Sequence, residues 1–170
     1  MLRTAAIPQA VQDAMNEQVK NELSSAYQYL AMSAYLESIT FPGAAKWMRE
    51  QAQEELGHAM RFYDFIVDRN GRAILQAIEK PRAEFSSILE VFEEAFRNEQ
   101  RVTSEIIGLH ELAAAQKDYV SHAFIQEFLM EQVEEEKTAL RVVDMLRMAG
   151  DSRSALLMID RELSARKGDL

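Results

Sequence analysis

Glu55 and His58 are the residues of this sequence best suited to metal chemistry, and both fall where a helix should be apolar. The segment QAQEELGHAMRFYDF, residues 51–65, has helix-forming composition, and its inward stripe, spaced by three and four residues, includes Phe62 and Phe65. Glu55 and His58 lie on that same stripe. Burying a carboxylate without a partner costs several kcal/mol, so this face is either wet or lies against a cation.

Three further amphipathic segments are interrupted in the same way. Their inward stripes begin at Met15, Phe85 and Ile125 and are mainly apolar. The main polar interruptions of the four stripes are Glu22; Glu55 and His58; Glu99; and Gln132 with Glu135. Each interruption lies close to the midpoint of its segment. Because helix midpoints share one level in a bundle whichever way each helix runs, we expect these six side chains to meet at its waist.

Four carboxylates, an imidazole and an amide are a suitable donor set for two divalent cations. Four ionised acids would carry about four negative charges, which either two such cations or shared protons could offset. Oxygen-rich ligation with imidazole and without sulfur suits iron or manganese, with zinc as a competitor. One Glu-x-x-His motif is weak evidence, but four coincident interruptions are strong, and they match the helix-bundle pattern of dinuclear carboxylate sites. The competing interpretation is a structural polar layer without metal.

Composition narrows the class of protein. The chain has 170 residues, 48% of them hydrophobic, with only 6 Gly and 3 Pro, which favours one helical domain over residues 1–170. The absence of cysteine excludes a disulfide scaffold, a zinc ribbon, an iron–sulfur cluster and a thiol nucleophile. A formal charge of -9 disfavours nucleic acid and anionic lipid as partners. Without an apolar signal sequence or membrane-spanning run, we expect a cytoplasmic protein.

Breaker residues divide the chain into four long helices and a short one. Pro42-Gly43, Asn70-Gly71 and Gly150 mark ends, and Ser87 with Glu90 has capping-box spacing. The expected helices are 8–37, 42–69, 86–115, 119–148 and 153–166.

The lengths of the connections predict the topology. The first and third are short, so each should join an antiparallel pair of helices. A helix of about 28 residues is about 42 Å long. An extended connection of about 14 residues, over 70–85, can reach about 46 Å and return the chain to its starting end. The predicted fold is therefore all-α, a four-helix bundle with one long crossover connection and a short fifth helix.

The segments that carry the polar residues resemble those of the non-haem bacterial ferritins. Matches in order and spacing are NEQVKNELSSAYQYLAMSAY, QAQEELGHAMRFYDF, RNEQRVTSEI and EQVEEEK, and the terminal ALLMIDREL is similar to that family's short last helix. The resemblance covers essentially the whole chain. It implies the ferritin-like bundle and a homo-oligomeric shell of about 24 subunits. Such a shell would oxidise Fe(II) with O2 or H2O2 and store ferric mineral inside.

The resemblance also assigns roles to individual residues. Glu22, Glu55 and His58 would bind one iron, and Glu55 would bridge to a second iron held by Glu99. Gln132 and Glu135 would lie near the second iron.

Two further roles follow from the same resemblance. Glu54, Glu131 and Glu134 occupy the positions of a third, looser iron site. Tyr29 occupies the position of a tyrosine beside the ferroxidase centre, where it could lend an electron. The alternative for Tyr29, a core tyrosine with a satisfied hydroxyl, fits the sequence equally well.

Three positions depart from related patterns. Leu56 stands where bacterioferritins carry a haem-ligating Met, and Gln132-Val133-Glu134-Glu135 lacks the histidine of their second Glu-x-x-His motif. Both differences indicate a haem-free protein. Glu127 stands where a Trp is expected from the resemblance to bacterial ferritins. This extra carboxylate could create another iron-handling position or simply face water, and we favour the second interpretation.

Other polar candidates have plainer interpretations. His110 and His122 have no partner spacing, and we expect them to be surface histidines. We expect Glu136 to be exposed. The short last helix, with its mixture of apolar and charged residues, fits docking against neighbouring subunits.

Two other functions also fit features of the sequence. A di-iron or di-manganese redox enzyme would need a substrate pocket beside the metals and would retain little iron. A DNA-protecting shell protein would place its metals between subunits, using residues absent here, and would often carry a basic tail. The C-terminal segment RELSARKGDL is short and mixed in charge.

Overall fold

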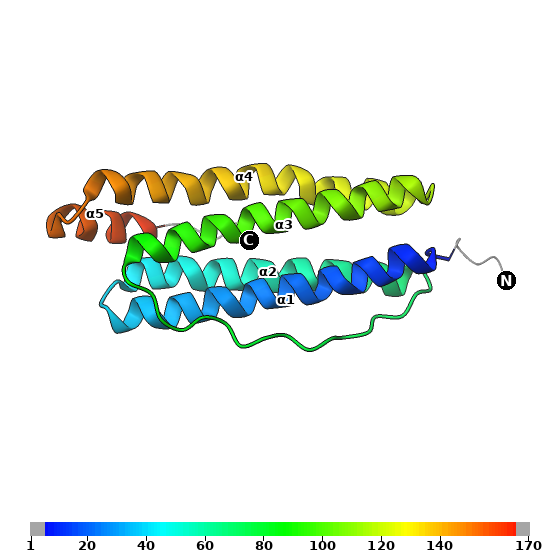
Figure 1. Cartoon of the computed structure of the whole chain (residues 1–170), viewed down its shortest axis with the longest axis horizontal. Helices are drawn as coiled ribbons and strands as arrows, with labels where there is room; N and C mark the ends of the chain where they lie inside the picture. The colour runs from blue at the N-terminus through cyan, green and yellow to red at the C-terminus, as the bar shows by residue number, and fades with distance from the viewer. Residues whose placement is uncertain (1–5, 166–170) are drawn as a thin grey trace.

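Four long antiparallel helices and one short helix form the part of the chain that this computed structural model describes, residues 6–165. The helices are α1 (Gln9–Ser38), α2 (Pro42–Asp68), α3 (Ile88–Ala115), α4 (Tyr119–Ala149) and α5 (Arg153–Ser164). Figure 1 shows the four long helices side by side, with α5 at one end. The all-α bundle predicted from the sequence is confirmed, and the expected boundaries agree to within two residues. Residue 166, the last of the expected fifth helix, lies outside the described residues.

Side-chain caps determine where α3 and α4 begin. The Ser87 hydroxyl accepts a hydrogen bond from the backbone N–H of Glu90 at 3.1 Å. The Glu90 carboxylate accepts a bond from the N–H of Ser86 at 2.6 Å, one residue before the position that a capping box would use. Asp118 caps α4 by accepting a bond from the N–H of Ser121 at 3.3 Å.

The connection between α2 and α3 runs along the outside of the bundle beside α1 (Figure 1). It has no regular secondary structure, so its backbone groups need partners from outside the segment. Asn16 of α1 donates to the Arg72 carbonyl at 3.1 Å and accepts from the Ile74 N–H at 2.8 Å. Gln12 accepts from the Arg72 N–H at 3.0 Å. These bonds hold the start of the crossover against α1 and fix the predicted topology.

The apolar core consists of two clusters of buried residues. The cluster nearer α5 includes Trp47 and Phe92, whose ring centroids lie 5.2 Å apart. The other cluster includes Phe62 and Phe128, which stack at 4.3 Å. The polar interruptions at the helix midpoints lie between these two parts of the core, as the sequence predicts.

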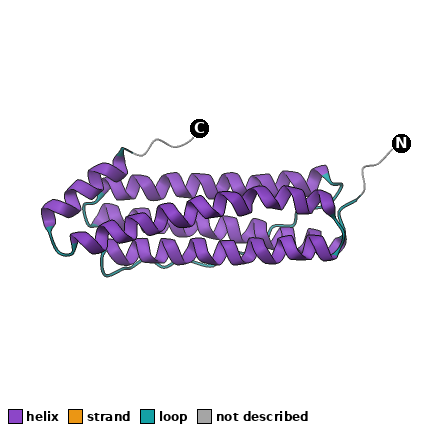
Figure 2. Ribbon diagram, turned by 90° about the horizontal axis from the view of Figure 1, so that it is seen from above, coloured by secondary structure: helices purple, strands orange, loops and turns teal. Residues whose placement is uncertain are grey.

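The short helix α5 packs on its own bundle, at the end of α2 and α4 (Figure 2). Ile159 and Leu163 are buried in the core, and Asp160 accepts a hydrogen bond from the N–H of Ala44 at 2.8 Å. A Cβ at Gly43 would lie 1.9 Å from the Asp160 carbonyl oxygen, so glycine is needed for this close approach. The expectation that α5 serves to dock against neighbouring subunits is therefore too narrow, because α5 packs on the bundle of its own chain. Its exposed apolar residues are Leu157 and Met158.

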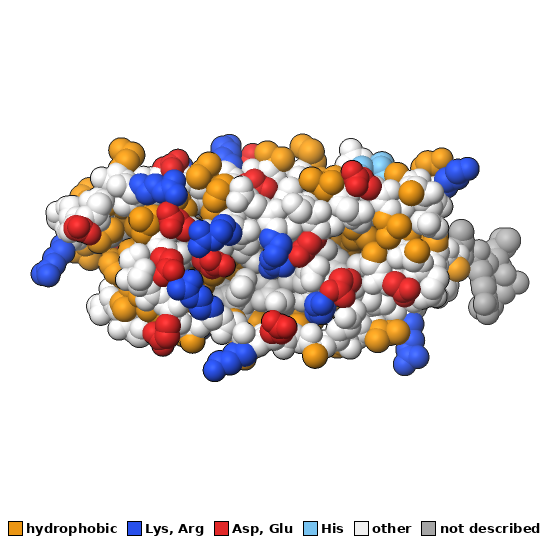
Figure 3. Space-filling model, in the orientation of Figure 1, with side chains coloured by type: hydrophobic (Ala, Val, Ile, Leu, Met, Phe, Trp, Pro, Cys, Tyr) orange, Lys and Arg blue, Asp and Glu red, His pale blue; other side chains and the backbone are white. Residues whose placement is uncertain are grey.

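Charges of both signs are intermixed on the face of the molecule drawn in Figure 3. Exposed ion pairs such as Arg97–Glu94 at 2.7 Å and Arg147–Glu93 at 2.9 Å typify the surface. Each contributes at most about 1 kcal/mol to stability.

Within residues 6–165, no helix is both long and apolar enough to cross a membrane.

Candidate metal centre

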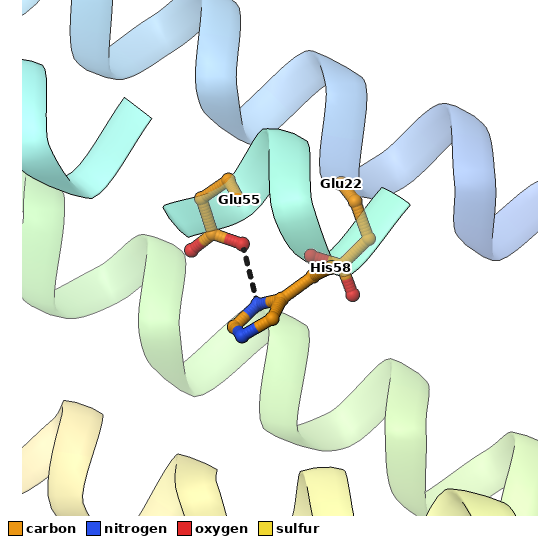
Figure 4. A group of neighbouring side chains, drawn as sticks. All are labelled: Glu22, Glu55 and His58. Atoms are coloured by element: carbon orange, nitrogen blue, oxygen red, sulfur yellow. Dashed lines mark hydrogen bonds and ion pairs between the residues drawn. The ribbon is translucent and has the colours of Figure 1, made fainter. Parts of the chain in front are cut away.

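Glu22 of α1 and Glu55 and His58 of α2 converge between the helices (Figure 4). Each offers one ligand atom, and these atoms all lie within 4.8 Å of one another. All three side chains are buried, and His58 Nδ1 lies 3.3 Å from Glu55 Oε2. Carboxylate oxygens and an imidazole nitrogen that meet in an apolar interior are a donor set for a divalent cation.

Glu99 of α3 and Gln132 of α4 complete the buried polar layer. Gln132 Nε2 donates to the Glu99 carboxylate and to the Glu99 backbone carbonyl, each at 3.2 Å. The Tyr29 hydroxyl donates a hydrogen bond to the other carboxylate oxygen of Glu99. Glu99 is thus held by α1 and α4 in this arrangement, outside the group of three ligand atoms.

The residues predicted for a third iron site are only partly brought together. Glu131 approaches the centre, with Oε2 at 3.2 Å from His58 Nε2, and Glu54 is half-buried. Glu134 is exposed and pairs with Lys137 at 3.3 Å. Glu131 therefore contacts the buried centre directly, through His58.

Burial and mutual repulsion raise the pKa of the buried acids. The pKa of Glu22 lies well above the ordinary value, first because of burial and then because of the neighbouring Glu55 carboxylate. The pKa of Glu55 also lies well above the ordinary value, first because of burial and then because of the Glu99 carboxylate. For Glu99, burial raises the pKa to about 7, although the Tyr29 hydrogen bond opposes this. Glu22 Oε2 is fully buried, and no donor from the described residues reaches it. A bound cation would supply the missing partner and offset the repulsion.

The environment of His58 favours its protonated form in the absence of metal. Burial alone would lower the His58 pKa, but the hydrogen bond to Glu131 and the charge of Glu22 raise it overall. His58 and Arg61 in turn lower the pKa of Glu131. The Tyr29 pKa is raised by burial and by the charge of Glu99, so its hydroxyl stays protonated as a donor.

Several polar partners of the centre were not predicted from the sequence. Gln18 donates to Glu22 at 2.8 Å, and Gln51 donates to Glu135 at 3.0 Å. Gln18 lies four residues before Glu22, and this i,i+4 spacing could have identified it. Gln51 reaches Glu135 across from α2 to α4, which local spacing does not indicate. Arg61 pairs with Glu131 at 2.8 Å, a contact between α2 and α4 that no local spacing indicates.

The structure adds one contact between peripheral residues and overturns one expectation. The rings of His110 and His122 lie against each other with centroids 3.7 Å apart. The expectation that Glu136 is exposed is wrong, because Glu136 is half-buried and accepts a hydrogen bond from the Thr103 hydroxyl at 2.6 Å. In each case the partner lies on the facing helix of the α3–α4 pair.

Comparison with known sequences decides the family. The sequence model of the ferritin-like domain matches residues 12–149, a range that contains every residue discussed for the centre. The chain belongs to the ferritin family. The resemblance seen in the sequence motifs is thereby confirmed.

Individual ferritins match over nearly their full lengths. The bacterial non-heme ferritin of Staphylococcus epidermidis is 43% identical over 153 residues, covering 90% of this chain and 92% of that protein. That of Bacteroides fragilis is 41% identical over 160 residues, covering 94% and 99%. An open pore ferritin from the hyperthermophilic archaeon Archaeoglobus fulgidus is 44% identical, with a TM-score of 0.95 over 96% of this chain and 100% of that one.

Proposed function

We propose that this ferritin stores iron by oxidising Fe(II) at the buried centre and retaining the ferric product inside a protein shell. Glu22, Glu55 and His58 bind one Fe(II), and Glu55 bridges to a second held by Glu99. Gln132 and Glu135 lie beside the second iron. The observation that carries the proposal is the convergence of three buried ligand atoms within 4.8 Å of one another.

The donor set accounts for the direction of the chemistry. Hard carboxylate oxygens favour Fe(III) over Fe(II), so the centre makes loss of an electron from each iron easier. Two electrons from two Fe(II), with two protons, reduce O2 to H2O2, and the same number reduce H2O2 to water. The neutral form of His58 limits the negative charge on the centre while supplying a strong ligand.

The surroundings of the centre support a haem-free protein with an exit route for product. Leu56 has no side-chain donor for a haem iron and is exposed on the outer face of α2. Glu54, Glu131 and Glu134 form the third, weaker cation site through which ferric product leaves. Tyr29 orients Glu99 through its hydroxyl, and its hydrogen bond also offers a path for a proton if the phenol gives up an electron.

An apolar groove on the outside of α1 and α2 supports assembly into a shell. Leu23, Ala26 and Leu30 of α1, together with Leu56 of α2 and Ile78 of the crossover, line a groove of about 330 Å³. Tyr27, Leu30 and Leu56 are each about half exposed. A contiguous apolar surface of this kind is typical of a protein interface, and we propose that a second copy of the chain covers it in a shell of about 24 subunits.

Iron retention tests storage directly. Metal-free protein is mixed in air with Fe(II) well above about two ions per chain, centrifuged, and separated by size. Storage predicts ferric iron that co-elutes with a large soluble assembly. If the excess precipitates as it does without protein, the storage proposal is overturned even if oxidation is fast.

A further inference from the structure

Arg61 of α2 is shared between two glutamates of α4. One terminal nitrogen, Nη1, donates to both oxygens of Glu131, at 2.8 Å and 3.1 Å. The other, Nη2, donates to Glu127 Oε2 at 3.0 Å. Glu131 also contacts His58 Nε2 at 3.2 Å. A continuous chain of charged groups therefore leads from the buried centre through Glu131 and Arg61 to Glu127.

Exposure is lowest at the inner end of this chain and highest at its outer end. The side chain of His58 is 8% exposed and that of Glu127 is 70% exposed, with Arg61 and Glu131 between these values. The guanidinium carbon of Arg61 lies 4.0 Å from the centre of the Phe128 ring. Stacking on Phe128, which lies between the two glutamates in sequence, holds the guanidinium within hydrogen-bond reach of both carboxylates.

We propose that Arg61 is an exchangeable counter-ion for Glu131 and that Glu127 is the carboxylate that receives it. Without a cation at the third site, Arg61 neutralises Glu131. When Glu131 turns to a cation, Arg61 moves onto Glu127. This inference rests on the proposed function, because it takes Glu131 to be a ligand of the third cation.

The contacts explain why the exchange would favour binding. In the observed arrangement Glu127 holds only one of the two terminal nitrogens, whereas Glu131 holds the other with both oxygens. Once Glu131 is withdrawn, both nitrogens can pair with both oxygens of Glu127 in the bidentate geometry that guanidinium and carboxylate prefer. The positive charge also moves away from the incoming cation. Glu127 thus lowers the cost of removing Arg61 from Glu131.

The competing explanations make a different prediction. If Glu127 were itself a cation ligand, or simply added negative charge, its removal would weaken binding whether or not Arg61 is present. If Glu127 acts through Arg61, its removal matters only while Arg61 is there. A double-mutant cycle of Arg61 and Glu127 separates the two cases.

The experiment measures equilibrium binding of Co(II) to metal-free protein by calorimetry and visible absorption. The variants are Arg61→Gln, Glu127→Gln and the double variant, with Asp144→Asn as a matched control for loss of an exposed α4 carboxylate. Loss of one ion in Glu131→Gln identifies the third site. The ions at Glu22, Glu55, His58 and Glu99 serve as the internal reference.

We expect Arg61→Gln to tighten binding of the third ion about three- to tenfold, because the ion pair that competes for Glu131 is removed. Glu127→Gln should weaken it about two- to fivefold, the range expected for one partly exposed ion pair. In the Arg61→Gln background, Glu127→Gln should have no effect. Asp144→Asn should leave all ions unchanged.

Three results would overturn the inference. One is an equal loss from Glu127→Gln in both backgrounds, and another is no change in Arg61→Gln. The third is the absence of any ion lost in Glu131→Gln, which would still leave the buried centre intact. If the protein binds no ions at the reference site of Glu22, Glu55, His58 and Glu99, the result would instead count against the proposed function. Should Arg61→Gln fail to fold, Arg61→Lys keeps the charge and the aliphatic stem and should show intermediate tightening.

Discussion

At the scale of single residues, the buried acids should make the stability of the metal-free protein depend on pH. The folded-state pKa of Glu99 is raised from 4.5 to about 7, and those of Glu22 and Glu55 are raised as well. A raised carboxyl pKa contributes stability that is fully present below the unfolded value and is lost as pH rises through the folded value. The metal-free protein should therefore lose stability between about pH 5 and pH 8.

Glu99→Gln tests this linkage. The variant keeps the shape of the side chain and removes its charge, so it should stabilise metal-free protein at pH 8 by at most about 3 kcal/mol. At pH 5 its effect should be small, because Glu99 is already protonated there. Denaturant unfolding in the presence of a chelator measures both values. Equal effects at the two pH values would show that Glu99 does not titrate as proposed.

Tyr29 can be tested separately as a structural or a redox residue. Tyr29→Phe removes the donor to Glu99 but keeps the buried ring, so we expect binding of the iron pair to weaken less than about fivefold. If Tyr29 also lends an electron, the first turnover should slow by more than that factor, and the transient absorption of a tyrosyl radical should disappear. Stopped-flow absorption with single-turnover iron distinguishes the two roles. An unchanged turnover rate would exclude the redox role.

At the scale of helices, the junction between α2 and α5 depends on a glycine. Gly43→Ala would place a methyl group 1.9 Å from the Asp160 carbonyl, so α5 must shift and the cap on Ala44 is lost. We expect destabilisation by about 1–3 kcal/mol and faster proteolysis within α5. Gly108→Ala is the control, because a Cβ at that helical position meets nothing within 4 Å. If both variants have equal thermal stability, the junction does not depend on Gly43.

The helices and the core of the centre were predictable because their signals are local. Proline, glycine and capping residues marked the ends of helices, and Glu22, Glu55, His58 and Glu99 interrupted stripes with a fixed period. Contacts between facing helices were not predictable in this way. The pairing of Arg61 with Glu127 depends on helix rotation and rotamers, which a single sequence does not specify.

At the scale of the whole molecule, the groove on α1 and α2 should control assembly. Leu30→Glu places a charge at a half-exposed position of that groove, so the chain should stay folded while the shell dissociates into smaller species. Leu30→Met, of similar size and polarity, should leave the assembly intact. Light scattering coupled to size separation gives the mass of each. A large assembly in Leu30→Glu would show that copies associate through another surface.

The measurement that tests the account most directly is rapid oxidation of Fe(II) by metal-free protein as iron per chain is increased. Stopped-flow ferric absorbance should show a fast phase that saturates at about two irons per chain. Glu55→Gln, which removes the bridging carboxylate, should reduce the rate of that phase at least about 100-fold while the helical fold persists. Oxidation no faster than in protein-free buffer, or a fast phase unchanged in Glu55→Gln, would contradict a ferroxidase centre at these residues.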